Sequence, residues 1–393
     1  MCSGNKKNSQ ERWIASITLV LVLVGFFIGL VRNSEDVYPY LNKLMPNTTS
    51  FKNTGLEAYT AFSSDAQETA TAYIATGEFD GFGGPLKMLT AIDTTGKIIS
   101  CEVIEQRETS SWYRRVMDAG ILETLRGKTC RDPFVLGQDV DGVTGATYTS
   151  RAIVESVKQA SRQIANENLH LNLADDADNK FTFGFPEISL ILLFILGYIA
   201  RGRGKKYLTR IRWFSLISGL LIIGCIINYQ ITIVDFSKLF MGYWPNFYNH
   251  VYWYILVWGV ILIYTVTGKN IYCQWICPFG AAQECIGAIG KAKAYSGFEY
   301  KATFKWIRWA IVWFAVISAF IFRNPGIASY EVYGTLFDLS GTNSQFILLI
   351  VILGAALLIK LPWCNYICPV PVFQNFAGIF RRWVLEIIKG KKA

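Results

Sequence analysis

Two stretches of the chain decide its fold: Cys273-Gln-Trp-Ile-Cys277-Pro278 and Cys364-Asn-Tyr-Ile-Cys368-Pro369. Each follows an apolar run that is long enough to cross a bilayer. Two further pairs of segments recur at nearly the same spacing, namely Ile211-Arg212-Trp213 with Ile307-Arg308-Trp309, and Phe236-Ser-Lys-Leu-Phe240 with Tyr333-Gly-Thr-Leu-Phe337. The pattern predicts one duplicated unit of two membrane helices, whose copies are related by a pseudo-twofold axis along the membrane normal.

The composition is typical of a chain that lies largely in lipid. Hydrophobic residues make up 52% of the 393 residues and charged residues 17%, against roughly 25% in ordinary globular proteins. We expect a multi-domain membrane protein with a bundle of about six helices. The candidate spans lie at about 13–31, 183–200, 213–230, 250–267, 306–322 and 345–361. The first has no small-residue cleavage site after it, so we interpret it as an uncleaved anchor.

The net charge of +9 is unevenly distributed. Residues 35–182 hold 14 Lys and Arg and 21 Asp and Glu, a net of −7, so the remaining residues carry +16. The positive charges lie in short loops beside apolar runs, which predicts membrane orientation and argues against a nucleic-acid partner. We expect a multi-pass protein of the cytoplasmic membrane, with both termini and the ends of both cysteine-bearing helices on the cytoplasmic side and the acidic segment outside.

The acidic segment predicts an extracytoplasmic α+β domain at residues 45–175, between the anchor at 13–31 and the membrane module at 183–393. Strands are expected at 71–75, 85–92 and 97–104, with a turn at 93–96, and a helix at 152–164. Residues 166–182 are a polar linker. A disulfide between Cys101 and Cys130 is possible in this oxidising compartment.

The duplicated cysteines indicate a metal centre. With only two histidines, His170 and His250, the nine cysteines must carry any metal chemistry. Two motifs that face one axis offer four thiolates, which is the number that an iron–sulfur cluster needs. We therefore expect one shared cluster, [4Fe–4S] in preference to [2Fe–2S], and a four-cysteine zinc site is the alternative. The proposed ligands are Cys273, Cys277, Cys364 and Cys368.

A second motif, Asp141-Gly-Val-Thr144-Gly145-Ala146-Thr147, lies in the outer domain. It is a glycine turn that opens a helix, where free backbone N–H groups and the helix dipole favour a phosphate. An ordinary helix cap would give the same pattern.

The motif resembles the flavinylation sequence of the FMN-binding domains in the RnfG and NqrC subunits, and the paired cysteine segments resemble the NosR/NirI family. The resemblance implies that a flavin transferase attaches FMN through its phosphate to the hydroxyl of Thr147. It also implies that Asp141 occupies the acidic position needed for modification and that Gly145 and Ala146 keep the turn small. Residues 81–86 and Glu108-Thr109 look like the flavin-proximal segments of that family. The remaining cofactor-binding candidates are Thr144, Gly145, Ala146 and Thr149, the last being the second candidate for attachment.

The resemblance implies transmembrane electron transfer between a cytoplasmic-side cluster and an extracytoplasmic covalent FMN, as a component of an oxidoreductase system. NosR proteins carry a cytoplasmic two-cluster ferredoxin tail, whereas this sequence ends at Ala393, so we expect a separate cytoplasmic electron donor. An extracytoplasmic acceptor protein or reductase and membrane lipid are the other expected partners. The alternatives are a redox sensor that regulates gene expression and, less consistent with both motifs, a zinc-stabilised scaffold.

Overall fold

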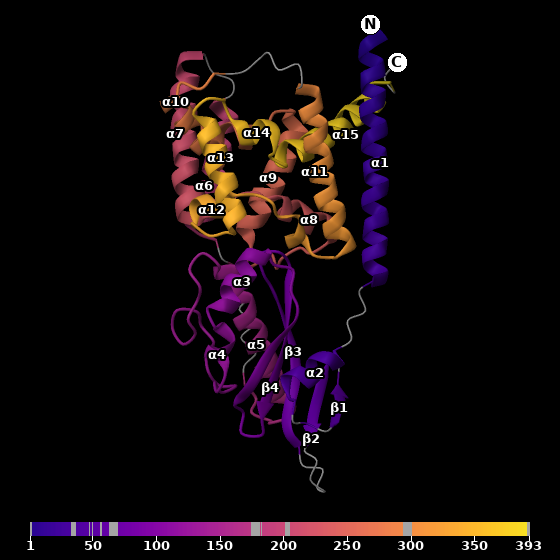
Figure 1. Cartoon of the computed structure of the whole chain (residues 1–393), viewed down its shortest axis with the longest axis vertical. Helices are drawn as coiled ribbons and strands as arrows, with labels where there is room; N and C mark the ends of the chain where they lie inside the picture. Colours follow the sequence, from indigo (N-terminus) through magenta and orange to yellow (C-terminus); the bar gives the residue numbers. More distant parts are fainter. Residues whose placement is uncertain are drawn as a thin grey trace.

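The computed structural model describes residues 2–32, 37–46, 48, 50–55, 57–62, 70–173, 181, 183–200, 205–293 and 301–390. A helical part and a mixed α/β domain follow one another along the long axis of the molecule (Figure 1). The mixed domain lies against the end of the helical part at which α8 and α12 are found.

The helical part has an apolar helix at every position where the sequence predicts a membrane span. Within the described ranges, three helical segments are long and apolar enough to cross a membrane: Glu11–Val31, Leu208–Ile227 and Thr303–Ile321. They lie in α1 (Cys2–Arg32), in α7 with η1 (Lys205–Gly219 and Leu220–Ile227), and in α11 (Lys301–Ile321). The other positions hold shorter apolar helices, namely α6 (Phe185–Ala200), α9 (Val251–Thr267) and α13 (Asn343–Ala356). The six-span bundle therefore stays a prediction.

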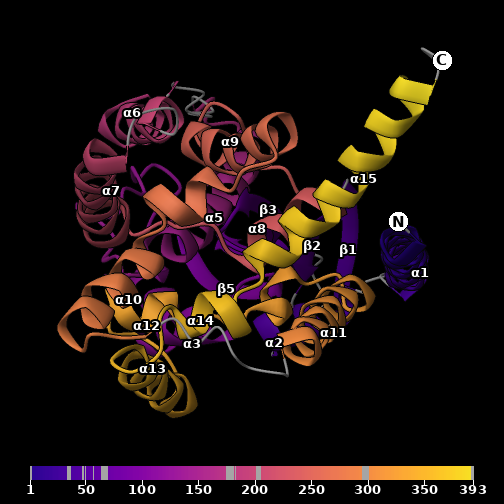
Figure 2. The same ribbon diagram turned by 90° about the horizontal axis from the view of Figure 1, so that it is seen from above.

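Further elements follow α7 and α11 in a similar order. The first set is α8 (Ile233–Met241), η2 (Tyr272–Ile276) and α10 (Pro278–Ile289). The second set is η3 (Pro325–Ala328), α12 (Tyr333–Phe337), α14 (Pro362–Tyr366) and α15 (Val370–Gly390). In the view from above, α15 runs outward from the bundle and α1 lies at the edge beside α11 (Figure 2). The pseudo-twofold relation of the two sets remains a prediction.

The chain turns back into the bundle after α9, which places the first cysteine motif among the helices. Gly219 lies so close to the carbonyl oxygen of Ile276 that a Cβ atom would overlap it. Further along the same helix, a Cβ on Gly224 would press on Phe337 and Pro278. Glycine at these two positions lets the cysteine loop approach the helix backbone directly.

The mixed domain is built on a five-stranded antiparallel sheet in the order β1-β2-β3-β4-β5. Its strands are β1 (Ser50–Gly55), β2 (Ala58–Phe62), β3 (Ala70–Asp80), β4 (Pro85–Asp93) and β5 (Ile98–Glu105). Side chains alternate between the two faces of the sheet, so that Met88 packs towards α5 (Thr147–Glu167) and Leu89 towards α2 (Tyr38–Leu44). Two short helices, α3 (Ser110–Asp118) and α4 (Ile121–Leu125), follow the sheet.

The expected strands 71–75 and 85–92 lie within β3 and β4, the strand expected at 97–104 matches β5 except for Lys97, and the expected helix lies within α5, so the existence of these elements is confirmed. The turn at 93–96 forms because the Asp93 carboxylate accepts hydrogen bonds from the backbone of Thr95 and Lys97, at 2.8 and 2.9 Å. The sequence did not predict β1, β2 or α2. Cys101 and Cys130 are free thiols, so the possible disulfide is not formed. Residues 174–180 and 182 of the expected linker lie outside the described residues.

Candidate functional site

The mixed domain is docked on the bundle by direct polar contacts. Lys238, which is 2% exposed, donates a hydrogen bond of 2.9 Å from Nζ to the carbonyl oxygen of Phe82. The guanidinium of Arg107 donates to the carbonyl oxygen of Arg323 at 3.2 Å. Gly326 lies so close to the carbonyl of Glu108 that no side chain would fit between them. This docking brings the loops of the domain against the loops of the bundle.

A pocket lies between the two parts, and we call it the interdomain pocket. Its cavity volume is about 90 Å³, and the unoccupied space is about 640 Å³ when the open mouth is included. The domain contributes Phe82, Thr109, Trp112, Gly145, Ala146, Tyr148 and Thr149 to its walls, and the bundle contributes Asn228, Tyr229, Gln230, Thr232, Ser329, Glu331, Tyr333, Gly334 and Asp338.

The glycine motif forms one edge of this pocket. Gly145 has a φ of 80°, a left-handed conformation that glycine adopts without strain, and it turns the chain into α5. The helix begins at Thr147, and no side chain caps its first backbone N–H groups. Thr147 is exposed, whereas Thr149 is buried. The turn therefore presents free N–H groups and an accessible hydroxyl, as a phosphate site requires. Asp141, Thr144 and Thr147 are exposed and are not among the pocket residues, but Thr147 lies between two residues that are, Ala146 and Tyr148.

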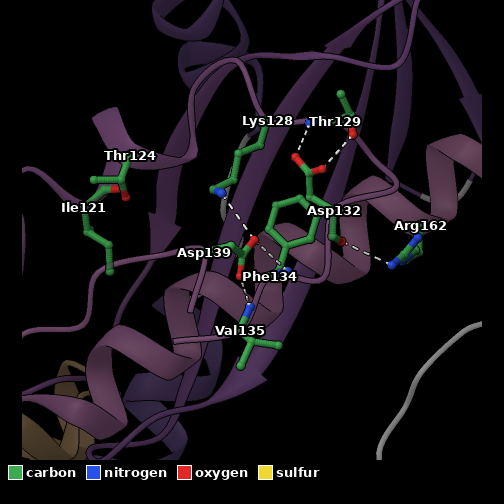
Figure 3. Close-up of polar contacts among 9 residues, drawn as sticks. All are labelled: Ile121, Thr124, Lys128, Thr129, Asp132, Phe134, Val135, Asp139 and Arg162. Atoms are coloured by element: carbon green, nitrogen blue, oxygen red, sulfur yellow. Dashed lines mark hydrogen bonds and ion pairs between the residues drawn. The ribbon is translucent and has the colours of Figure 1, made fainter. Parts of the chain in front are cut away.

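The loop that leads into the motif is fixed to the rest of the domain by polar contacts (Figure 3). The Asp139 carboxylate accepts hydrogen bonds from the backbone N–H groups of Phe134 and Val135. From α5, Arg162 donates to the carbonyl oxygens of Cys130 and Asp132, at 2.8 and 3.3 Å. These contacts fix the loop at both ends, so the position of the motif that follows it is fixed relative to the rest of the domain.

Glu108 lies beneath the pocket and is 1% exposed. Its carboxylate accepts hydrogen bonds from the Thr149 hydroxyl at 2.6 Å and from the backbone N–H of Gly83 at 3.1 Å. Burial raises the pKa of Glu108 above its ordinary value, and these hydrogen bonds together with the charge of Lys238 partly offset the increase. A Cβ on Gly81 would overlap the Glu108 carboxylate, so the glycine loop and Glu108 form one closely packed unit.

Buried polar atoms around the pocket lack partners within the described part of the chain. Thr109 Oγ1, Gln230 Oε1 and Glu331 Oε2 belong to residues of the pocket wall, and Arg115 Nη1 lies beside the Gly145 turn. Leaving a buried donor or acceptor unpaired costs about 1–3 kcal/mol. Unpaired donors and unpaired acceptors around one pocket therefore fit a polar ligand with several hydrogen-bonding groups. The Arg115 guanidinium beside the turn fits an anionic group on that ligand.

Aromatic rings form the apolar surface of the same pocket. The ring of Tyr229 lies 5.3 Å from that of Phe82 and 5.5 Å from that of Tyr148, between ring centroids. Trp112 and Tyr333 also line the pocket. Aromatic walls favour a flat ring system through stacking and edge contacts. Together with the unpaired polar atoms and the phosphate-type turn, they fit the ring, hydroxyl groups and phosphate of FMN.

The four predicted ligands, Cys273, Cys277, Cys364 and Cys368, line a single small cavity of about 20 Å³ in the bundle. We call it the cysteine cavity; its wall is otherwise mostly apolar and aromatic. The two motifs are thus brought together, and four soft sulfur donors in apolar surroundings fit an iron–sulfur cluster. Among the described residues, no group of three or more histidine, cysteine or carboxylate side chains is arranged to hold a single metal ion.

The interdomain pocket and the cysteine cavity share two wall residues, Gln230 and Tyr333. The cysteines therefore lie next to the pocket, so the expectation that they lie at helix ends remote from the mixed domain is wrong. The physical reason is the return of the chain into the bundle beside Gly219, which loop charge does not reveal.

Sequence reasoning missed the bundle side of the site. Gln230, Glu331 and Tyr333 come from connections between apolar runs and belong to no recognised motif. Arg115 lies on a short helix of the mixed domain without a distinctive neighbour. The one available signal was the repeat, which singled out the segment that contains Tyr333 but gave it no chemical role.

Comparisons with known proteins match both parts of this site. Residues 81–162 match the family model of the FMN-binding domain, and residues 249–295 and 344–386 match that of the 4Fe-4S binding domain. The chain therefore carries both domains, and the second match supports a cluster over zinc at the cysteines.

Among curated proteins, the chain is 25% identical to protein NirI of Paracoccus denitrificans over 47% of this chain and 30% of that protein. It is 20% identical to the regulatory protein NosR of Stutzerimonas stutzeri, over 60% of this chain and 34% of NosR. It is also 27% identical to the G subunit of the proton-translocating ferredoxin:NAD(+) oxidoreductase complex of Clostridium ljungdahlii, over 24% of this chain and 53% of that protein. The chain spans about a third of NirI and NosR and about half of the Clostridium protein. The predicted resemblance to NosR/NirI, with an RnfG-type FMN domain, is confirmed.

Proposed function

We propose that this protein transfers electrons between a [4Fe–4S] cluster bound by Cys273, Cys277, Cys364 and Cys368 and an FMN attached covalently to Thr147. The observation that carries the proposal is the wall that the interdomain pocket shares with the cysteine cavity. Electron-transfer rates fall steeply with the distance between centres. Two centres that occupied these sites would be separated by little more than the side chains of this wall.

The residues of the outer domain hold the flavin in this proposal. The Thr147 hydroxyl is the attachment point for the phosphate, and the exposed position of that side chain admits a flavin transferase. The uncapped start of α5 and the unpaired Arg115 nitrogen stabilise the phosphate charge. Asp141 and Thr144, which are exposed outside the pocket, are assigned to recognition by the transferase.

The residues of the bundle complete the site. When bound, FMN exchanges one or two electrons and an iron–sulfur cluster exchanges one, so the pair can connect one-electron and two-electron chemistry. Tyr229 and Phe82 keep water from the ring, while the partnerless oxygens of Gln230 and Glu331 offer it hydrogen bonds. These residues position the ring against the wall of the cysteine cavity.

We propose a multi-pass arrangement in the cytoplasmic membrane, with both termini inside and the FMN-binding domain outside. The charge difference between residues 35–182 and the rest of the chain supports this orientation. A cytoplasmic donor would then supply electrons to the cluster, and an extracytoplasmic acceptor protein or reductase would take them from the flavin. The net direction, outward, follows the analogy with the relatives.

A redox sensor is the second candidate, because one of the relatives is a regulatory protein by name. It would use the same two centres but would pass a conformational signal to a partner in place of sustained electron flow. Steady-state turnover with an external acceptor separates the two functions: a sensor reaches a fixed redox state and stops.

The experiment is to purify the full-length protein from its native membrane and measure covalent flavin, iron and acid-labile sulfide. Rapid mixing of the oxidised protein with a reductant should then show cluster reduction followed by flavin reduction. Zinc in place of iron and sulfide, or a flavin that stays oxidised while the cluster is reduced, would contradict the proposal.

A further inference from the structure

We propose that Tyr333 is a positioning residue that sets the redox properties of the cluster, through a hydrogen bond from its hydroxyl to the sulfur of Cys368. The inference rests on the proposed function, because it assigns a role to the residue between the two proposed centres. Tyr333 begins α12, is 3% exposed and lines both the interdomain pocket and the cysteine cavity.

The direction of this hydrogen bond is set when Cys368 is a cluster ligand, because a thiolate sulfur carries no proton and can only accept. The oxygen of Tyr333 lies 3.5 Å from the sulfur of Cys368 and 3.1 Å from Nε1 of Trp363. An indole N–H can only donate, so the tyrosine oxygen accepts from Trp363 and its own proton is free for the sulfur. Trp363 and Tyr333 are both buried, so this chain of hydrogen bonds is shielded from bulk solvent.

Gln283 also donates a hydrogen bond to a ligand sulfur, but it does not line the interdomain pocket. Gln283 donates from Nε2 to the sulfur of Cys364 at 3.4 Å, and its oxygen accepts from the backbone of Trp363 at 2.9 Å. Gln283 is not part of the interdomain pocket. Tyr333 therefore combines two properties that Gln283 does not: it contacts a ligand sulfur and it faces the flavin site.

The sequence repeat supports a specific use of the hydroxyl. Phe236 occupies the position that aligns with Tyr333 in the other copy, and its ring stacks on Phe373 with 4.2 Å between ring centroids. A phenylalanine thus satisfies the packing at the aligned position. The hydroxyl of Tyr333 adds a donor that packing alone does not require.

Hydrogen bonds to ligand sulfurs tune the reduction potential of iron–sulfur clusters. A donated proton partly neutralises the sulfur charge, which favours the reduced and more negative state. In the transfer step the cluster is oxidised by one electron and the flavin is reduced by one. Tyr333 keeps its proton throughout and no bond to it forms or breaks, so its role is to set the driving force and hold the wall in place.

The test is Tyr333→Phe in the full-length protein, purified with both centres and titrated redox-potentiometrically with spectroscopic detection. We expect a lower midpoint potential of the cluster, with the reduction equilibrium shifted about fivefold, the factor that corresponds to a hydrogen bond of about 1 kcal/mol. The content of iron and covalent flavin should stay at the wild-type level. The matched control is Tyr330→Phe, because the Tyr330 hydroxyl donates to the carbonyl oxygen of Ile367, at 3.1 Å, in the same loop but not to a sulfur. It should leave the midpoint potential unchanged.

A second variant keeps the inference testable where Tyr333→Phe fails to assemble the cluster. Incorporation of 3-fluorotyrosine at position 333 preserves the shape of the ring and makes the hydroxyl a stronger donor, so the midpoint potential should rise. A potential that does not respond to either replacement, or an equal shift in Tyr330→Phe, would overturn the inference while leaving the proposed function intact. A wild-type protein without iron and sulfide would instead overturn the proposed function.

Discussion

The hydroxyl of Thr149 donates a hydrogen bond of 2.6 Å to the carboxylate of Glu108, and each of the two residues is 1% exposed. Thr147 lies two positions earlier in α5, which places it on nearly the opposite side of the helix, and it is exposed. The two threonines therefore have different environments: Thr149 is part of the floor of the pocket, and only Thr147 offers a hydroxyl to an external enzyme.

The attachment site is tested by Thr147→Ala. Covalent flavin fluorescence of the protein on a denaturing gel should disappear, because the variant lacks the accessible acceptor hydroxyl, while the protein should still insert into the membrane. Thr149→Ser, which keeps the hydroxyl bonded to Glu108, is the matched control and should retain fluorescence. Fluorescence of wild-type intensity in Thr147→Ala would place the attachment at another residue.

Glu108→Gln tests the buried carboxyl. Because the pKa of Glu108 is raised in the folded domain, ionisation favours the unfolded chain as the pH rises from about 4.3 through the folded pKa, and stability falls over that window. Glutamine does not ionise and can accept from Gly83 while donating to Thr149. The variant should therefore gain stability relative to the wild type at higher pH.

This difference can be measured by calorimetry of the detergent-purified protein at pH 4 and pH 8. Glu123→Gln, which changes an exposed carboxylate on α4, should follow the wild-type profile. If the difference in stability between Glu108→Gln and the wild type is the same at both pH values, Glu108 ionises as readily in the folded domain as in the unfolded chain.

Single-cysteine substitutions test whether the two motifs bind one cluster. Cys273→Ser and Cys364→Ser should give the same phenotype, a loss or marked perturbation of the iron–sulfur signal, because both thiols line one cavity. Covalent flavin at Thr147 should be retained in both. Serine can act as an oxygen ligand, so an altered signal agrees with the prediction. Half of the iron remaining in each variant, from complementary sites, would indicate two separate centres.

The orientation is tested with two reporter cysteines and a membrane-impermeant thiol reagent in intact cells. Glu123→Cys lies on the outer domain and should be labelled, and Lys293→Cys, beyond the end of α10, should be labelled only after the membrane is permeabilised. Labelling is compared with that of the wild type, which contains its own cysteines. The opposite pattern would invert the proposed topology.

Local patterns predicted the parts of this structure that depend on local physics. Apolar runs located the helices, and the turn residues around Asp93 located a hairpin, because burial in lipid and tight turns each restrict nearby residues. The motif that ends at Thr147 and the paired cysteine motifs predicted the two candidate sites, because the residues that define each motif are close together in the sequence.

The parts that depend on how the chain packs could not be predicted. The return of η2 into the bundle needs Gly219 and Gly224 to meet a segment about fifty residues later, and no local pattern encodes that contact. Tyr333 and Gln230 matter because they end up between two cavities. Their roles arise from the assembled fold alone.

The close approach of Gly326 to Glu108 bears on how fast the protein can work. Backbone meets backbone at this point, and the contacts of Lys238 with Phe82 and of Arg107 with Arg323 lie around it, so the domain cannot swing without losing all of them together. A carrier that has to travel between its partners is slowed by a viscous medium. A domain seated in this way has no travelling step, and the electron exchange between its flavin and the bundle should proceed at the same rate in glycerol as in water.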